Sequence, residues 1–272
     1  MAQSPLIIVR GGGDIATGTI CRLHNCGFRL LVLEVANPTA IRRTVSISET
    51  LQLGSHNVEG VKAERIERVA DCERIWQNSR VPVIVDPNAD CLGTLATQPS
   101  CIVDAILAKK NLGTTIDMAP ITIGIGPGFT AGLDVHAVIE TNRGHDLGRI
   151  IYTGSATANT SIPAEVGGFS KERVLYATQA GTFRLMRDIG SVVYQDELLA
   201  KIGNSPVIAP FTGLVRGILR DGTTVHKGLK IADIDPRLDE LKNCWTISDK
   251  ARSIGGSVLE AFLALQVRNT SL

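Results

Sequence analysis

The chain has 272 residues, a mass of 29.0 kDa, 44% hydrophobic residues, a net charge of +1 and a pI of about 7.6. This balance excludes the basic footprint of a protein that binds nucleic acid or an anionic membrane. No apolar run reaches the roughly 18 residues of a membrane span, and the start MAQSPLIIVR favours a first strand over a signal peptide, so we expect a cytoplasmic protein.

Six cysteines are scattered along the chain without a C-x-x-C pair. In a cytoplasmic protein we expect them to be reduced rather than disulfide-bonded. Cys21, His24 and Cys26 are close in sequence, but on one helix they would point over too wide an arc to share an ion. We therefore expect no metal site.

Residues 6–34 predict a strand, a glycine turn, a helix, a second strand and a terminal acid. The turn matches the G-x-G-x-x-G/A fingerprint of dinucleotide-binding units, and the acid follows at about the expected distance. Gly11 suits the tight turn, Gly13 leaves room for a pyrophosphate, and the N–H groups at the helix start face its charge. The predicted cofactor-binding residues here are Gly11, Gly12, Gly13, Asp14, Ile15 and Glu34.

The terminal acid indicates which cofactor this unit would prefer. Glu34 would accept hydrogen bonds from ribose hydroxyls and disfavour a 2′-phosphate, so the ligand would be NAD-like. Arg42 and Arg43 could reverse that preference, although the sequence favours surface charges at both positions. Asp14 suits a helix cap but competes with an anionic ligand. A tight turn that binds nothing is the alternative for the whole unit.

Apolar runs at 81–85, 100–104 and 119–125 lack polar alternation, which is typical of strands buried on both faces of a parallel sheet. Acids end or follow several of these strands, and ligands of open α/β sheets lie beyond the carboxyl ends of the strands. We therefore predict an α/β fold in which residues 1–165 form a Rossmann-like parallel-sheet domain with one ligand crevice. Residues 41–66 predict a long loop with short helices.

Three residues are candidates for catalysis in this crevice. Asp104 ends a predicted strand and Lys109 follows it, whereas His136 is predicted on a strand with Asp134 and Glu140 on the same face. A histidine flanked by carboxylates suits proton transfer, and a structural histidine is the alternative. For Lys109 the alternative is a solvated surface lysine.

A second glycine-dense stretch, GIGPG, overlaps the end of the strand at 119–125. It is too rich in glycine for a simple turn and would present backbone N–H groups to an anion. The predicted binding residues in this stretch are Gly124, Gly126 and Gly128.

An internal repeat marks a second domain. A shift of 32 residues superposes 181–202 on 213–234, which predicts two β units that interlock as a small sandwich. The joining stretch VIAPFTGLV resembles the biotinyl/lipoyl barrel-sandwich hybrid, but the hairpin IGNSPV has no lysine at its tip, so we expect no covalent biotin or lipoate. We predict this small all-β domain at 166–240 and a closing C-terminal helix at 241–272 that packs back on the first domain.

Nearly the full length resembles one known family. The segments VRGGGDIATG, NPTAIRRTVSISE, GIGPGFTAGLDVHAVIETNRGHDLGR and DKARSIGGSVLEA are similar to the YqeB kind of selenium-dependent molybdenum hydroxylase maturation protein. The resemblance implies an accessory role in equipping molybdenum hydroxylases with active cofactor, with the hydroxylase or its cofactor-assembly proteins as partners. Chaperones of the XdhC kind hold molybdopterin on a Rossmann-like domain, and by analogy a molybdopterin-type ligand would occupy the crevice.

Three functions remain open from the sequence. The leading hypothesis is an accessory protein that binds a nucleotide or molybdopterin-type ligand over Gly11–Gly13. The second is an NAD-dependent oxidoreductase in which His136 or Lys109 handles the proton. The third is a non-catalytic scaffold whose β domain docks a partner, and assembly into a homo-oligomer is compatible with each of them.

Overall fold

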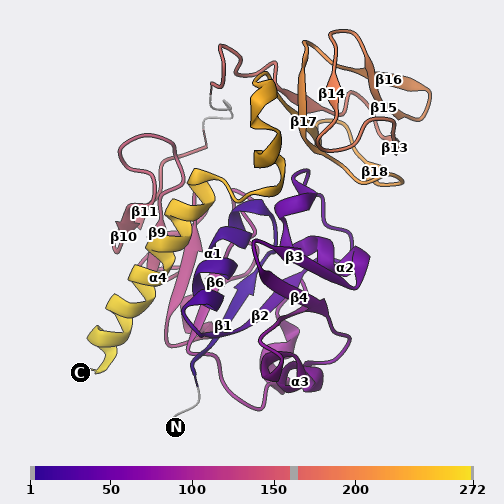
Figure 1. The fold of residues 1–272 in the computed structure, drawn as a ribbon. Coiled ribbons are helices and arrows are strands. Elements are labelled where there is room, and N and C mark those ends of the chain that lie inside the picture. Colours follow the sequence, from indigo (N-terminus) through magenta and orange to yellow (C-terminus); the bar gives the residue numbers. More distant parts are fainter. Residues whose placement is uncertain (1–3, 160–164, 271–272) are drawn as a thin grey trace. The chain divides into compact units, whose positions relative to one another are not determined.

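The computed structural model describes residues 4–159 and 165–270 and divides into two compact units. The first unit comprises Met1–Pro38, Ser46–Asn159 and Ile247–Leu272, and the second comprises Thr39–Val45 and Thr160–Thr246. The second unit therefore interrupts the sequence of the first in two places. Figure 1 shows the consequence, since the yellow last helix belongs with indigo and magenta elements rather than with the orange strands that precede it in sequence.

The first unit contains a nine-stranded sheet with the strand order β10-β9-β7-β6-β1-β2-β5-β4-β3. Its strands are β1 Leu6–Arg10, β2 Arg29–Glu34, β3 Ser55–Val58, β4 Val61–Arg65, β5 Val81–Val85, β6 Cys101–Asp104, β7 Thr122–Ile125, β9 Ala137–Ile139 and β10 Ile150–Ile151. Two short strands, β8 (Thr130–Ala131) and β11 (Gly154–Ser155), form a separate antiparallel pair.

This sheet is mixed. The strands from β9 to β4 run parallel to one another, whereas β3 and β10, at the two edges, are antiparallel to their neighbours. The β3–β4 hairpin forms because Glu59 and Gly60 both adopt positive φ angles of 48° and 90°, as a two-residue type I′ turn requires. The loop predicted over 41–66 therefore contains two strands.

The predicted Rossmann-like parallel-sheet domain is wrong, because the sheet is mixed and most of its crossovers lack a long helix. A doubly wound fold places a helix on each parallel connection. Here only β1 and β2 are joined by a helix of more than two turns, α1 (Asp14–Asn25), while α2 (Thr50–Leu53) and α3 (Cys72–Gln77) are short. Apolar strand patterns reveal burial on both faces, but they do not reveal which segment covers each face.

The covering segment on one face is α4 (Asp249–Thr270), which packs against α1, β7 and β9. The two helices approach closely because each has a glycine at the contact. A Cβ at Gly18 would overlap the Ala251 carbonyl, and one at Gly255 would lie 2.6 Å from the Gly18 oxygen. The next residue, Gly256, faces open space. Within 4–159 and 165–270, no helix combines the length and apolar character needed to cross a membrane.

The second unit contains two four-stranded antiparallel sheets, ordered β12-β19-β17-β14 and β16-β15-β13-β18. The strands are β12 Val174–Tyr176, β13 Gly181–Leu185, β14 Val192–Val193, β15 Leu198–Ile202, β16 Ser205–Ile208, β17 Gly213–Ile218, β18 Thr224–Val225 and β19 Lys230–Asp235. In the sequence repeat, the short strand of each copy pairs with the first strand of the other, β14 with β17 and β18 with β13. Two antiparallel sheets are thus observed in place of the predicted barrel-sandwich-hybrid-like domain.

Residues 39–45 belong to this second unit, which corrects the surface charges expected at Arg42 and Arg43. Arg42 is 4% exposed, and its Nη2 donates to the Asn243 and Thr246 carbonyls at 3.0 Å. Arg43 donates to the Asp188 carboxylate at 2.6 Å. Both arginines therefore hold the 39–45 segment in place.

Candidate functional site

Strand register brings most of the predicted site residues to one edge of the nine-stranded sheet. Arg10 of β1 lies level with Asp104 of β6, and Asp104 lies level with Gly124 of β7. The glycine loop Gly11–Gly13 and the GIGPG stretch therefore both leave the carboxyl edge of the sheet. His136 does not, because it precedes β9 and lies at the amino edge.

Two glycines of the first loop are required by the packing of the protein itself. Gly11 has a φ of +93°, and a Cβ there would lie 2.9 Å from the Ala105 oxygen. A Cβ on Gly12 would lie 2.9 Å from the Ser48 nitrogen, which donates to the Gly12 carbonyl at 2.8 Å. These glycines are therefore explained without a ligand.

Gly13 differs, because a Cβ at this position would meet no atom within 4 Å. Its φ of −65° and ψ of 179° are open to any residue, and it precedes α1 without a side-chain cap. Ile15 lies in the first turn, where backbone N–H groups have no partner within the helix and carry the positive end of its dipole. The space beside Gly13 thus adjoins a group of N–H donors that favours an anion.

Glu34 caps the same loop from β2. Its Oε2 accepts a hydrogen bond from the Gly12 N–H at 2.8 Å, and its Oε1 accepts one from the Val35 N–H at 2.8 Å. Burial raises the pKa of Glu34, and the two N–H donors only partly offset that effect. Because a carboxylate already occupies the Gly12 N–H, an anionic group at this loop would have to bind further along, towards α1.

Asp104 takes part in a buried polar network rather than facing open space. Asp104 and Arg10 are each 2% exposed, with Arg10 Nη1 and Asp104 Oδ2 3.6 Å apart. Thr114 donates its hydroxyl to Asp104 Oδ2 at 2.6 Å, and Arg10 also donates to the carbonyls of Pro87 and Leu112. This network holds β1, β6 and the 111–114 turn together. Sequence reasoning missed Arg10, because a single arginine ending an apolar strand gives no distinctive signal.

The second glycine loop is filled by protein atoms at all three predicted positions. A Cβ at Gly124 would meet the Phe129 ring at 2.6 Å, and one at Gly126 would meet the Thr141 hydroxyl at 2.9 Å. Gly128, with a φ of +114°, packs against the backbone of Lys110. The neighbouring Lys109 is exposed and has a positive φ of 62°.

Glu140 is a further acid of the candidate site. Glu140 is 4% exposed and accepts backbone N–H bonds from Thr141, Asn142 and Thr157 at 2.6–2.7 Å. Burial alone would raise the pKa of Glu140, but these N–H donors outweigh it and the pKa lies below its usual value.

Lys250 is the site residue that the sequence did not reveal. It precedes Ala251, which contacts Gly18, and it follows Asp249, which pairs with Arg143 at 3.0 Å. Burial lowers the pKa of Lys250, as does the charge of Arg143, whereas Asp14, Glu140 and Asp249 act in the opposite direction. A partly buried lysine thus lies within electrostatic reach of the first residue of α1. We call Gly13, Asp14, Glu34, Glu140 and Lys250 the α1 site.

His136 lies away from this site. The Thr122 backbone N–H donates to His136 Nδ1 at 3.0 Å, so the ring proton of the neutral form belongs on Nε2. Burial lowers the pKa of His136, and Asp117 partly offsets this. The strand β9 spans only 137–139, so Asp134, His136 and Glu140 all lie outside it and the predicted shared strand face is wrong. Asp134 instead accepts the Thr130 N–H at 2.7 Å.

A protein of Escherichia coli (strain K12) called "Uncharacterized protein YqeB" is 48% identical to this chain over 260 residues. The chain is a relative of YqeB. This finding supports the YqeB family inferred from the sequence. The match covers 96% of this chain but 48% of YqeB, so the chain spans about half the length of its relative. No protein-family model matches the chain.

Two solved structures have some likeness to this chain. The ectoine utilization protein EutE (DoeB) of Ruegeria pomeroyi in its product-bound form is 14% identical, with a TM-score of 0.25 and 85% of each chain covered. An aspartoacylase family protein of Mesorhizobium loti is 14% identical, with a TM-score of 0.29 and 86% of each chain covered. These TM-scores are too low to inform fold or function.

Proposed function

We propose that the chain binds a phosphate-bearing ligand, a nucleotide or a molybdopterin-type molecule, at the α1 site. The observation that carries this proposal is the open space beside Gly13 at the uncapped start of a 12-residue helix. Helix N-termini favour phosphate because their unpaired N–H groups and the helix dipole act together. Gly11 and Gly12 are needed for packing, so Gly13 is the glycine of this loop that a ligand would explain.

Lys250 supports an anionic ligand at this position. Asp14, Glu34 and Glu140 would repel a phosphate, and Lys250, which interacts with Asp14 and Glu140, offsets part of that charge. Partial burial strengthens its interaction with an anion, because the local dielectric constant is lower than that of water. We expect the Lys250 ammonium to contact the phosphate while the helix N–H groups bind it from the other side.

Glu34 favours a ligand that also carries hydroxyl groups. Each carboxylate oxygen accepts one backbone N–H and retains a further lone pair. A ribose or pterin-side-chain hydroxyl can donate to that lone pair, whereas a 2′-phosphate would be repelled. The ligand is therefore NAD-like rather than NADP-like if it is a dinucleotide.

We propose that ligand binding serves an accessory role in the maturation of molybdenum hydroxylases, in the cytoplasm and with the hydroxylase or its cofactor-assembly proteins as partners. The family resemblance is the basis of this role. The arrangement of side chains favours it over an oxidoreductase, because His136 lies at the opposite sheet edge and Lys109 is an exposed loop residue. Holding a ligand requires no proton donor at this position.

Native mass spectrometry followed by calorimetry tests the ligand. The purified chain should carry or bind a dinucleotide or pterin, and Gly13→Val should weaken binding at least about tenfold, since one hydrogen bond to a charged group contributes roughly 1.5–3 kcal/mol. Gly93→Val is the matched control, because Gly93 also faces open space without a positive φ. Lys250→Met should weaken binding similarly, with Lys62→Met as its control. Equal affinity in the Gly13 and Gly93 variants would contradict the proposal.

The accessory role needs a cellular measurement. In cells that depend on this chain, Gly13→Val should lower the activity of a molybdenum hydroxylase in proportion to the loss of ligand affinity. Gly93→Val should not. Normal hydroxylase activity with a variant that has lost its ligand would separate ligand binding from maturation and reject the role.

A further inference from the structure

The strand β3 lies at one edge of the nine-stranded sheet, where β4 is its one hydrogen-bonded neighbour among the described residues. The Arg65 N–H donates to the Gly54 carbonyl at 2.8 Å, which fixes the pattern of this antiparallel ladder. Hydrogen-bonded and non-hydrogen-bonded pairs alternate along such a ladder, so Ser55 and Asn57 fall in non-hydrogen-bonded pairs. Their N–H and C=O groups therefore point away from β4, towards the open edge.

Apart from its short length, this edge lacks the usual protection against pairing with a further strand. Natural edge strands are covered, or interrupted by proline, a bulge or a charged side chain. The strand β3 reads Ser-His-Asn-Val, pairs with β4 in unbroken register, and exposes Ser55 and Asn57. An extended peptide that lies along β3 would satisfy the outward N–H and C=O groups, which is a common mode of peptide recognition.

A hollow of about 430 Å³ adjoins the same edge and carries positive charge. Lys62 lies opposite Asn57, is exposed, and pairs with no carboxylate of the described residues. Arg80 donates to the Glu64 carboxylate at 2.7 Å, and its guanidinium retains further N–H donors. The lining residues are Ser55, His56, Asn57, Lys62, Ala63 and Arg80, and no acid is among them.

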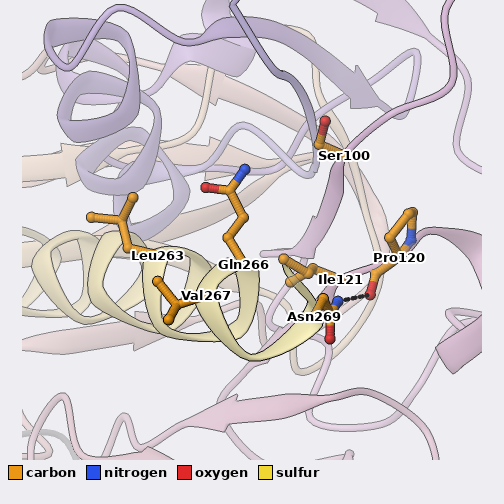
Figure 2. A pocket seen from close by; sticks show the side chains of 7 residues that line it. All are labelled: Ser100, Pro120, Ile121, Leu263, Gln266, Val267 and Asn269. Atoms are coloured by element: carbon orange, nitrogen blue, oxygen red, sulfur yellow. Dashed lines mark hydrogen bonds between the residues drawn. The ribbon is translucent and has the colours of Figure 1, made fainter. Parts of the chain in front are cut away.

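The hollow beside the last turns of α4 has neither of these properties (Figure 2). None of its seven lining residues carries a charge, and the Asn269 amide donates to the Pro120 carbonyl at 3.3 Å. The strands that begin beside it, β6 and β7, are interior strands of the sheet. Positive charge and an open strand edge therefore coincide at β3, and each limits what would bind there.

The open edge and the charge together define the chemistry of the occupant. The outward groups of Ser55 and Asn57 include both donors and acceptors, which an extended polypeptide matches, whereas the phosphates of a nucleic acid can only accept. A second copy of this chain would bring two positively charged hollows together, which is unfavourable. We propose that β3 and this hollow bind an extended acidic peptide segment of a partner protein, with carboxylates that face Lys62 and Arg80. This inference is independent of the ligand proposed for the α1 site.

Fluorescence anisotropy with the full chain tests this peptide site. The probe is a fluorescein-labelled peptide of about eight residues, slightly longer than an average strand. Glu alternates with Thr in the probe, so that its carboxylates share one face. We expect saturable binding of this peptide and binding at least about tenfold weaker when Lys replaces Glu. N-methylation of the peptide amides should weaken binding about as much, because the peptide backbone can then no longer donate to β3.

Variants of the chain locate the peptide. Lys62→Glu should weaken binding of the Glu-containing peptide about tenfold or more, because it reverses a charge of the hollow. Lys227→Glu is the matched control, since Lys227 is also an exposed lysine but belongs to the second unit, and it should leave binding unchanged. Asn57→Pro removes an outward N–H without removing a hydrogen bond of the β3–β4 ladder, and it should also weaken binding. If Asn57→Pro does not fold, the N-methylated peptide still tests the backbone pairing.

Several results would overturn the proposal. They are no binding of the Glu-containing peptide, equal affinity for the Lys-containing or N-methylated peptide, or unchanged affinity in Lys62→Glu. Full competition by free glutarate would instead make the hollow a site for small anions. A dimer that Asn57→Pro dissociates would identify a second copy of the chain as the occupant. The ligand of the α1 site should bind Lys62→Glu normally, so that the two proposals can fail separately.

Discussion

The two glycine loops at the carboxyl edge look alike in sequence but differ in what surrounds them. In the GIGPG loop, each of the three predicted positions would place a Cβ against protein atoms. In the Gly11–Gly13 loop, two positions do so and the third faces open space at the start of α1. A glycine in a loop therefore indicates a close approach of some kind, and only the space around it shows whether a ligand or the protein makes that approach.

The largest effect should come from the buried Arg10–Asp104 pair, which adjoins both loops. Arg10 precedes Gly11, and Asp104 lies level with Gly124. Asp104→Ala removes one member of the buried Arg10–Asp104 pair, and breaking such a pair typically costs about 3–5 kcal/mol in the free energy of unfolding. Denaturant unfolding measures this loss. Replacing both residues, as in Arg10→Met with Asp104→Leu, should cost less because no buried charge is left alone. Full stability in Asp104→Ala would contradict a structural role for this buried pair.

The GIGPG loop should lose stability when its last glycine gains a side chain. Gly128→Ala combines a φ of +114° with an approach of 2.7 Å to the Lys110 backbone, and we expect a loss of about 2–4 kcal/mol. Gly132→Ala is the matched control, because Gly132 also has a positive φ but faces open space, and should lose about 1–2 kcal/mol. Equal losses would show that packing against Lys110 is unimportant.

The first loop should tolerate the corresponding change at its open position. Gly13→Ala meets no atom and needs no unusual φ, so the free energy of unfolding should change by less than about 1 kcal/mol. Chemical denaturation in the absence of ligand checks this. A loss as large as that of Gly128→Ala would remove the contrast between the two loops.

The smallest effect concerns pH, and the two acids beside these loops should act with opposite signs. The pKa of Glu34 is raised above its ordinary 4.5, so its contribution to stability is present below pH 4.5 and is lost as the pH rises through the raised value. The pKa of Glu140 is lowered, so its contribution is present above pH 4.5 and is lost as the pH falls through the lowered value.

Glutamine substitutions isolate these two terms. The stability difference between the wild type and Glu34→Gln should move against the glutamate as the pH rises from 4 to 7. The difference for Glu140→Gln should move in favour of the glutamate as the pH rises towards 4.5, and against it as the pH falls through the lowered pKa. Unfolding curves at several pH values give both slopes, and slopes of the same sign would contradict the assignment.

Local patterns predicted strands better than they predicted the arrangement of the chain. The apolar run at 81–85 placed β5 at its observed bounds, and the first strand predicted within residues 6–34 is β1. The edge strand β3 was missed because Ser55–Val58 has little apolar character, although the Glu59–Gly60 pair between β3 and β4 was a usable turn signal. Antiparallel edges and missing crossover helices depend on long-range packing, and no periodicity in the sequence reports them.

Only the part of the candidate site that comes from residues 6–34 was predictable from the sequence. Gly13 and Glu34 follow from the glycine fingerprint and the strand that ends in an acid. Lys250 follows α1 by more than 220 residues, and it comes near the α1 site because α4 packs on α1 at Gly18. His136 was misplaced relative to the loop because sequence alone did not show that β9 begins after it.

The insertion of the second unit has a consequence for synthesis on the ribosome. The face of α1 that contains Gly18 can be covered only after α4 has been translated, and the whole repeat-containing segment emerges before α4 does. The inserted unit therefore has time to fold while the earlier part of the nascent chain still lacks its covering helix. During that interval the face of α1 around Gly18 stays uncovered, and the packing of the first unit is complete only once α4 docks on it.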